Sequence, residues 1–193
     1  MKRVIGIAVL AAAIGAGAAH AQSFEKPFAE IGLGITSSGD YQFGAIHWDD
    51  DRSVSGRLSF GFENFIGPLE LRADYLSTGI GDIFEDMDIS SFMLSGVLNH
   101  EVTDWLTVYA GGGAGIAMSD YTGGSLAQYP GLHSEDTQPT WMAMAGARAQ
   151  LFNSPASIFL EGQYHAASDF EIAPGAIAEY SVLGAMTGLR WNF

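Results

Sequence analysis

Apolar and polar residues alternate one by one along much of this chain, most clearly from Leu69 to Tyr75. The odd-numbered residues of this segment are apolar or aromatic, and the even-numbered ones are Glu70, Arg72 and Asp74. Successive side chains of a β-strand point to opposite faces, whereas a helix would mix the two sets. The segment is therefore predicted to be a strand with one apolar and one charged face.

The same alternation recurs in other segments, each with apolar residues at every second position. Strands of about 10–11 residues are long enough to cross a membrane, and eight of them leave room for the connections. The predicted strands centre on 29–36, 54–63, 69–75, 91–99, 106–116, 143–151, 158–165 and 183–193.

The connections between these segments alternate strictly between short and long. The short ones, rich in the turn-forming residues Asn, Gly and Pro, are Asn64–Pro68, Asn99–Asp104 and Asn153–Ala156. The long ones are about Ser37–Arg52, Ser77–Asp88, Met118–Gln138 and Ala167–Glu179. Up-and-down membrane barrels show this alternation, with short periplasmic turns and long outer loops. We therefore predict an all-β fold, an eight-stranded antiparallel up-and-down transmembrane β-barrel with both termini periplasmic.

Charged residues within the predicted strands fall on the face opposite the apolar one. An eight-stranded barrel is just wide enough for side chains to fill, and buried charges need partners. We expect an ion-paired plug, with a gated, narrow ion path as the alternative. A soluble, lipocalin-like barrel would instead turn the apolar face inward around a ligand. The predicted lumenal charge network consists of Glu30, Arg57, Glu70, Arg72, Asp74, Arg148, Glu161 and Arg190.

The N-terminus has the features of a cleavable signal peptide over residues 1–21. Lys2-Arg3 is followed by an unbroken apolar and glycine run from Val4 to Ala19, and then by the small-x-small sequence ending at Ala21. The barrel domain would span 22–193. Removing Lys2 and Arg3 lowers the formal charge from −14 to −16.

Composition excludes several classes of function. The absence of Cys excludes disulfides, Cys-based zinc sites and thiol catalysis. With 8 Lys and Arg against 22 Asp and Glu, a nucleic-acid partner is excluded as well. No cofactor is expected, because the spacing of His47, His100, His133 and His165 matches no ligand motif.

The predicted long loops carry most of the acidic residues and a single basic residue, Arg52. Asp86-x-Asp88-x-Ser90 begins like a calcium loop but lacks the glycine and the final glutamate of that motif. We expect a solvated acidic rim that binds divalent cations weakly and reaches lipopolysaccharide phosphates through them. The acidic residues concerned are Asp49, Asp50, Asp51, Asp82, Glu85, Asp86 and Asp88.

Two groups contain residue types found in hydrolases, His133-Ser134-Glu135-Asp136 and the pair His165 and Ser168. Catalytic triads are spatial arrangements, and adjacent residues rarely present that geometry. No catalytic residue is therefore assigned, although a lipid A-modifying enzyme stays as a third alternative.

The C-terminus resembles the insertion signal of bacterial outer-membrane barrels, with Leu189, Trp191 and a terminal Phe193 at alternate positions. Thr103–Gly115 and Phe159–Tyr164 resemble strands of the small opacity-protein-like and outer-membrane-protein-A-like barrels. This resemblance implies a Gram-negative outer membrane, contact with its lipid and lipopolysaccharide, and insertion by the barrel-assembly machinery.

The resemblance does not imply one activity, because fold does not fix function. We expect a non-enzymatic protein that contributes to envelope integrity, with acidic surface loops available for adhesion or for another extracellular ligand. A small diffusion channel is the alternative.

Overall fold

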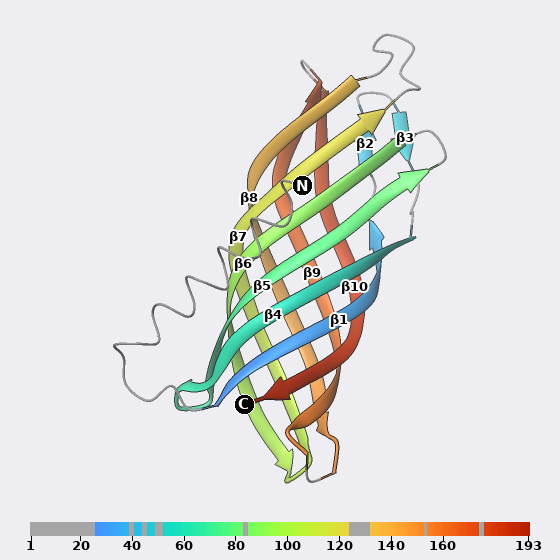
Figure 1. The fold of residues 1–193 in the computed structure, drawn as a ribbon. Coiled ribbons are helices and arrows are strands. Elements are labelled where there is room, and N and C mark those ends of the chain that lie inside the picture. Colours follow the sequence, from blue (N-terminus) through green and yellow to red (C-terminus); the bar gives the residue numbers. More distant parts are fainter. Residues whose placement is uncertain are drawn as a thin grey trace.

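The computed structural model describes residues 26–38, 41–43, 46–48, 52–82, 85–123, 132–152, 154–173 and 176–193. Over these residues the chain forms a closed barrel of eight strands and a separate two-stranded sheet (Figure 1). The barrel strands are β1 (Pro27–Ser38), β4 (Arg52–Ile66), β5 (Leu69–Asp82), β6 (Glu85–Thr103), β7 (Leu106–Gly123), β8 (Leu132–Gln150), β9 (Ala156–Ala173) and β10 (Ala176–Asn192). The small sheet pairs β2 (Tyr41–Phe43) with β3 (Ile46–Trp48).

Each barrel strand pairs antiparallel with its neighbours in the order β1-β10-β9-β8-β7-β6-β5-β4. The first and last barrel strands close the ring, from Phe28 opposite Asn192 to Ser38 opposite Val182. The predicted eight-stranded antiparallel up-and-down barrel is therefore confirmed. Among the described residues, no helix is long and apolar enough to cross a membrane. The proposed signal peptide lies outside the described residues and stays a prediction.

Three tight connections lie at the end of the barrel where β1 begins and β10 ends, which we call the turn end (Figure 1). Gly67-Pro68 joins β4 to β5, Asp104-Trp105 joins β6 to β7, and residues 151–155 join β8 to β9. Gly67 has a φ of 62°, a conformation that glycine adopts without steric cost. The opposite end of the barrel is called the loop end.

The predicted long connections were wrong in length, because they include residues that belong to the strands. The strands run past the predicted loop boundaries, so that Asp82 of β5 pairs with Glu85 of β6 and Gly123 of β7 pairs with Leu132 of β8. The barrel strands have 12 to 19 residues rather than about 10–11. The prediction ended each strand where outward apolar residues stop, but backbone pairing continues beyond that belt, with exposed polar residues such as Asp88 and Glu135.

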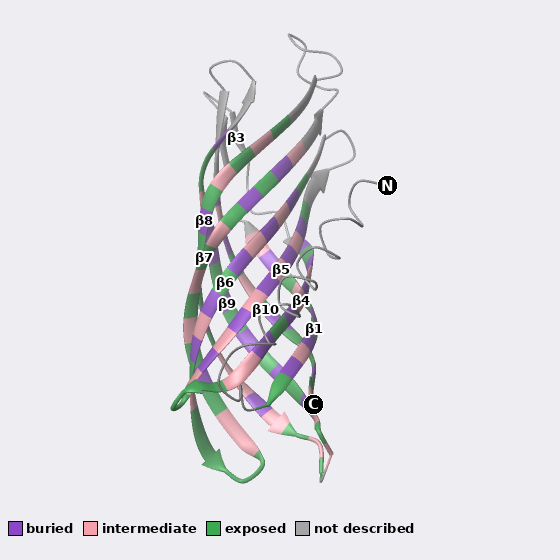
Figure 2. Ribbon diagram, turned by 60° about the vertical axis from the view of Figure 1, so that its left-hand side comes forward, coloured by how far each residue is buried: buried purple, intermediate pink, exposed green. Residues whose placement is uncertain are grey.

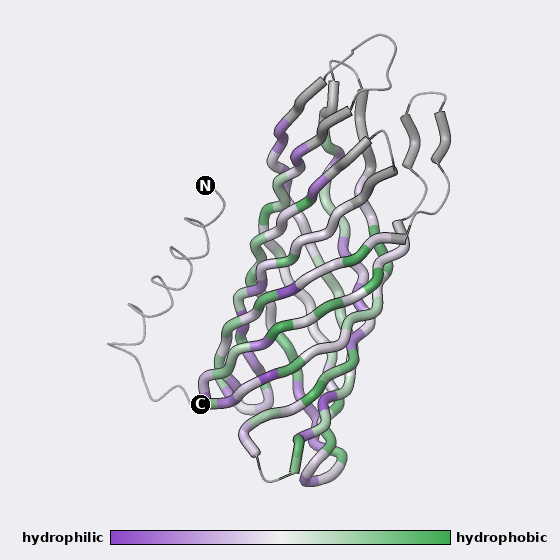
Figure 3. Tube along the Cα trace, turned by 45° about the vertical axis from the view of Figure 1, so that its right-hand side comes forward, coloured by the Kyte–Doolittle hydropathy of each residue, from purple (hydrophilic) through white to green (hydrophobic). Residues whose placement is uncertain are grey.

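The two faces of the barrel wall differ as the alternation predicts. Buried and exposed residues alternate along the strands (Figure 2), and hydrophobic positions recur along each of them (Figure 3). Outward apolar side chains such as Leu33 and Leu160 are each 65% exposed, while the eight charged side chains predicted to line the lumen are buried. This is the reverse of a lipocalin-like barrel, whose apolar face lines the interior. Apolar surface on this scale is suited to lipid rather than water.

Exposed aromatic side chains lie toward the two edges of the outward apolar band, in the middle of β8 and β9 and at the turn end. Trp141 and Tyr164, on neighbouring strands, form a tilted pair with ring centroids 5.2 Å apart. At the turn end, Trp191 and Phe193 are exposed. These positions are those of the interfacial girdles that flank the apolar band of membrane barrels.

Candidate functional site

The lumen contains all eight charged residues that the alternation assigned to it, and Glu63 of β4 joins them. They come from β1, β4, β5, β8, β9 and β10, and each of the eight is buried. Strands β6 and β7 instead contribute much of an apolar wall, because Met93, Val97 and Tyr109 form one cluster with Met142 and Met144 of β8. The charges therefore face one another across a lumen that is apolar on one side.

Glu30 is the centre of this network. Its carboxylate lies 3.0 Å from Arg190, 3.4 Å from Arg72, 3.5 Å from Arg57 and 3.9 Å from Arg148. One carboxylate on β1 thus contacts the arginines of four other strands. Charges removed from water are costly unless they are paired, and here each arginine also has other acidic partners.

The remaining carboxylates complete the pairing. Glu161 pairs with Arg57 and lies 3.3 Å from Arg72. Glu70 lies 2.9 Å from Arg190 and 3.4 Å from Arg148. Together with the contacts of Glu30, these ion pairs connect both sides of the barrel through its interior.

Asp74 shows how a fully buried carboxylate is satisfied. It accepts hydrogen bonds from Ser59 and Ser95, at 2.5 and 2.6 Å, on the strands to either side. Its carboxylate also lies 3.2 Å from Nε of Arg72. Arg72 belongs to the predicted lumenal network, and both serines are fully buried beside it.

Three of the four arginines lie over an inward aromatic ring, and each ring packs on a glycine directly opposite it on the next strand. The distances from Cζ to the ring centroid are 3.3, 5.2 and 5.7 Å. The three sets are Arg190, Phe28 and Gly61; Arg57, Phe159 and Gly188; and Arg148, Tyr109 and Gly146. A Cβ at any of these glycines would approach the ring to between 2.6 and 2.8 Å, so only glycine leaves room for it.

His165 lies deeper in the lumen, on the loop-end side of Glu161 along β9, and is fully buried. Its Nε2 is 2.7 Å from Oγ1 of Thr140, and its Nδ1 is 3.1 Å from the hydroxyl of Tyr180. Both ring nitrogens are therefore occupied by residues other than Ser168, the partner considered from the sequence. The side chains of His47, His133 and Ser134 lie outside the described residues, and His100 is exposed at the turn end.

Only some of the acidic residues considered for weak cation binding lie among the described residues. Asp49, Asp50 and Asp51 lie outside the described residues, and Asp82, Glu85 and Asp86 are described in backbone only. Asp88 is exposed on β6. In the part of the chain whose side chains are described, no group of three His, Asp or Glu residues is arranged to hold a metal ion. The cation-binding loops stay a prediction.

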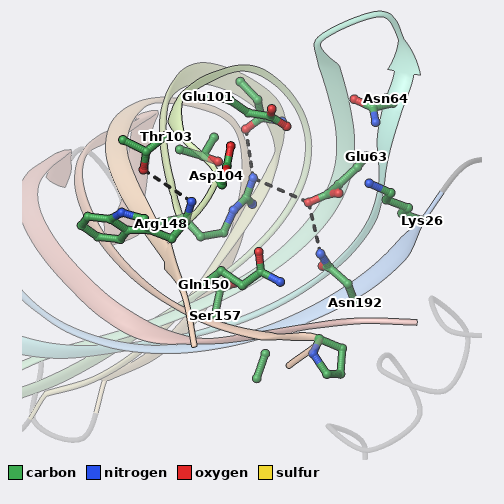
Figure 4. Close-up of a pocket in the computed structure, with 15 residues that line it drawn as sticks. Lys26, Glu63, Asn64, Glu101, Thr103, Asp104, Arg148, Gln150, Ser157 and Asn192 are labelled. Atoms are coloured by element: carbon green, nitrogen blue, oxygen red, sulfur yellow. Dashed lines mark hydrogen bonds and ion pairs between the residues drawn. The ribbon is translucent and has the colours of Figure 1, made fainter. Parts of the chain in front are cut away.

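A polar cavity of about 210 Å³ opens at the turn end, and we call it the turn-end pocket (Figure 4). Its lining includes Glu63, Arg148, Asn192 and Ser157 as well as Asp104 of the β6–β7 turn. Arg148 points to Glu63, at 3.7 Å, and Glu63 in turn accepts a hydrogen bond from Asn192 (Figure 4). The network thus forms the floor of the pocket.

Residues 7–193 match the family model described as the outer membrane protein beta-barrel domain. The chain belongs to this outer-membrane β-barrel family. Membership confirms the resemblance to small outer-membrane barrels and makes the protein a component of the bacterial outer membrane. Among curated proteins, none matches the sequence.

Solved structures of the same architecture include neisserial surface protein A, with 13% identity and a TM-score of 0.67. That match covers 86% of this chain and 97% of the other. The attachment invasion locus protein Ail of Yersinia pestis matches with 14% identity and a TM-score of 0.55, covering 88% and 99%. It has also been solved in complex with the heparin analogue sucrose octasulfate. At these identities the likeness shows the fold alone.

Proposed function

We propose that this outer-membrane barrel is a non-enzymatic envelope protein with a closed lumen, periplasmic termini and an acidic outer surface. The observation that carries the proposal is Glu30, whose carboxylate contacts all four lumenal arginines. Ion pairs that cross the interior join strands on opposite sides and occupy the space that a diffusing solute would need. A protein built in this way contributes a rigid, impermeable element to the membrane.

The loop end supports a second part of the proposal, contact with partners outside the cell. The strand extensions there carry Asp88, Asp120, Glu135, Asp136 and Asp169, all at least partly exposed. Such a rim would repel a polyanion like the sucrose octasulfate complexed with Ail. We expect basic partners instead, or lipopolysaccharide phosphates bridged by divalent cations.

Gene deletion with complementation tests the envelope role. Loss of the protein should admit detergents and large antibiotics through the outer membrane, and the wild type should restore the barrier. A variant with Asp88, Glu135 and Asp169 changed to Asn and Gln should restore the barrier as well. Cells with this variant should bind less strongly to positively charged surfaces than cells with the wild type. An unchanged barrier in the deletion strain would contradict the envelope role.

The non-enzymatic assignment has a separate test. Alanine variants of His133, Ser134 and His165, together with the wild type, would be expressed in a host whose lipid A is then profiled by mass spectrometry. We expect identical lipid A from all strains and from a strain without the protein. An acyl change that depends on one of these residues would establish an enzyme.

A further inference from the structure

The turn-end pocket contains a buried polar group that no residue of the described chain satisfies. Ser157 lies at the turn end of β9 and is 5% exposed. Its hydroxyl has no hydrogen-bond partner in this part of the structure. A buried hydroxyl without a partner is unfavourable, so native proteins supply water or a ligand. Ser157 is one of the residues that line the cavity, which makes the pocket the place where that partner would sit.

From the chemistry of its lining we propose that the turn-end pocket binds one ring of a neutral saccharide. Lys26 and Arg148 are set against Glu63, Glu101 and Asp104, so formal charges nearly cancel. The other polar side chains are amides and hydroxyls, which both donate and accept hydrogen bonds. Sugar hydroxyls have the same dual capacity, whereas a phosphate or a metal ion would need a surplus of one charge.

The size of the pocket and its aromatic residue agree with this ligand. Its volume of about 210 Å³ lies below the roughly 300–1,000 Å³ of sites for drug-sized molecules, as expected for a single ring. Trp105, in the β6–β7 turn, lines the pocket and is 59% exposed. An exposed indole offers an apolar face and one donor, which matches the mixed apolar and hydroxylated surface of a sugar ring.

The floor of the pocket is held in place before any ligand arrives. Arg148 donates a hydrogen bond to Oδ1 of Asn99 at 3.2 Å and is ion-paired with Glu70. The amide of Asn99 in turn donates to Glu70 at 3.2 Å. Fixed polar groups cost less entropy on binding than mobile ones. The saccharide in the cell would be a glycan of the periplasm, a step that rests on the periplasmic orientation proposed above.

The test uses the full mature protein in nanodiscs or in a detergent without a sugar headgroup, because alkyl glycosides would compete for the pocket. A tetramer of N-acetylglucosamine and a tetramer of glucose are titrated while backbone amide signals are followed by NMR. Saturable shifts confined to turn-end residues are expected for at least one tetramer. If neither tetramer shifts these signals, or if the shifts are spread over the barrel, the proposal is wrong.

Variants localise the binding. Trp105→Ala and Ser157→Ala should each weaken it about fivefold, the effect of one lost ring contact or hydrogen bond. Thr137→Ala, at the loop end, is the matched control and should leave binding unchanged. Equal affinity in all variants would overturn the proposal. Heat-shifted migration on gels confirms that each variant is folded, and the result stands apart from the envelope role because it does not depend on membrane permeability.

Discussion

The guanidinium of Arg190 lies 3.3 Å from the centroid of the Phe28 ring, across the seam where the last strand of the barrel meets the first. The ring fills the space above Gly61 on the other side of β1. This contact and the ion pairs of Arg190 join β10 to β1, β4 and β5 at the point where barrel closure depends on non-local contacts.

Arg190→Leu should destabilise the folded barrel by about 3–5 kcal/mol, because the buried Glu30 and Glu70 and the partly buried Glu63 each lose a partner. Urea unfolding in lipid vesicles, followed by tryptophan fluorescence, measures the loss. Arg190→Lys keeps the charge but not the planar stack on Phe28. Its stability should therefore lie between those of the wild type and Arg190→Leu. If Arg190→Leu unfolded at the same urea midpoint as the wild type, the charge network would contribute little to stability.

Gly146→Ala should destabilise the barrel by about 1–3 kcal/mol through overpacking. A Cβ at this position would lie 2.7 Å from the Tyr109 ring and 2.5 Å from the carbonyl oxygen of Leu160. Gly162→Ala on the adjacent strand is the control, because its Cβ would have no contact nearer than 3.9 Å. Equal urea midpoints for the two variants would refute the packing role of the glycine.

His165 should be neutral and carry its proton on Nε2. Thr140 donates its hydroxyl proton to the carbonyl oxygen of Ala166 at 2.7 Å, so its oxygen accepts from Nε2. The Tyr180 hydroxyl then donates to Nδ1. Nitrogen NMR shifts of the imidazole distinguish the two tautomers directly. A proton on Nδ1 would show that the hydrogen-bond chain runs in the opposite direction.

Leu160→Arg should destabilise the membrane-inserted barrel by as much as about 2–4 kcal/mol, since it places a charge on the lipid-facing side of β9. Thr137→Arg, exposed beyond the apolar band, should have little effect. Both variants are compared by urea unfolding in vesicles. If Leu160→Arg were as stable as Thr137→Arg, the outward face of β9 would not contact the lipid.

The alternation of residues was sufficient to predict the barrel and its inward charges, because a strand wall with lipid on one side must separate the two classes. Glu30, Arg57 and Glu161 could therefore be assigned to the lumen without knowing which strands touch. Their pairing could not be assigned, since it depends on strand stagger. The hub role of Glu30 follows only from the register of β1 with β4 and β10.

Other features depended on spatial neighbours that no local pattern specifies. Phe28 and Gly61 are far apart in sequence, and only the paired register shows that one fills the space above the other. The turn-end pocket combines residues from several turns, so its lining could not be predicted from the sequence either. The strand extensions were missed for a different reason, since polar residues such as Asp120 and Glu135 gave no amphipathic signal while their backbones still pair.

Single-channel recording in planar lipid bilayers tests the closed lumen most directly. The purified mature protein, inserted at near-neutral pH, is recorded over a range of voltages. The ion pairs around Glu30 predict a silent membrane, with no steps above the lipid background. Reproducible conductance steps of uniform size from the wild-type protein would contradict the account and establish a channel.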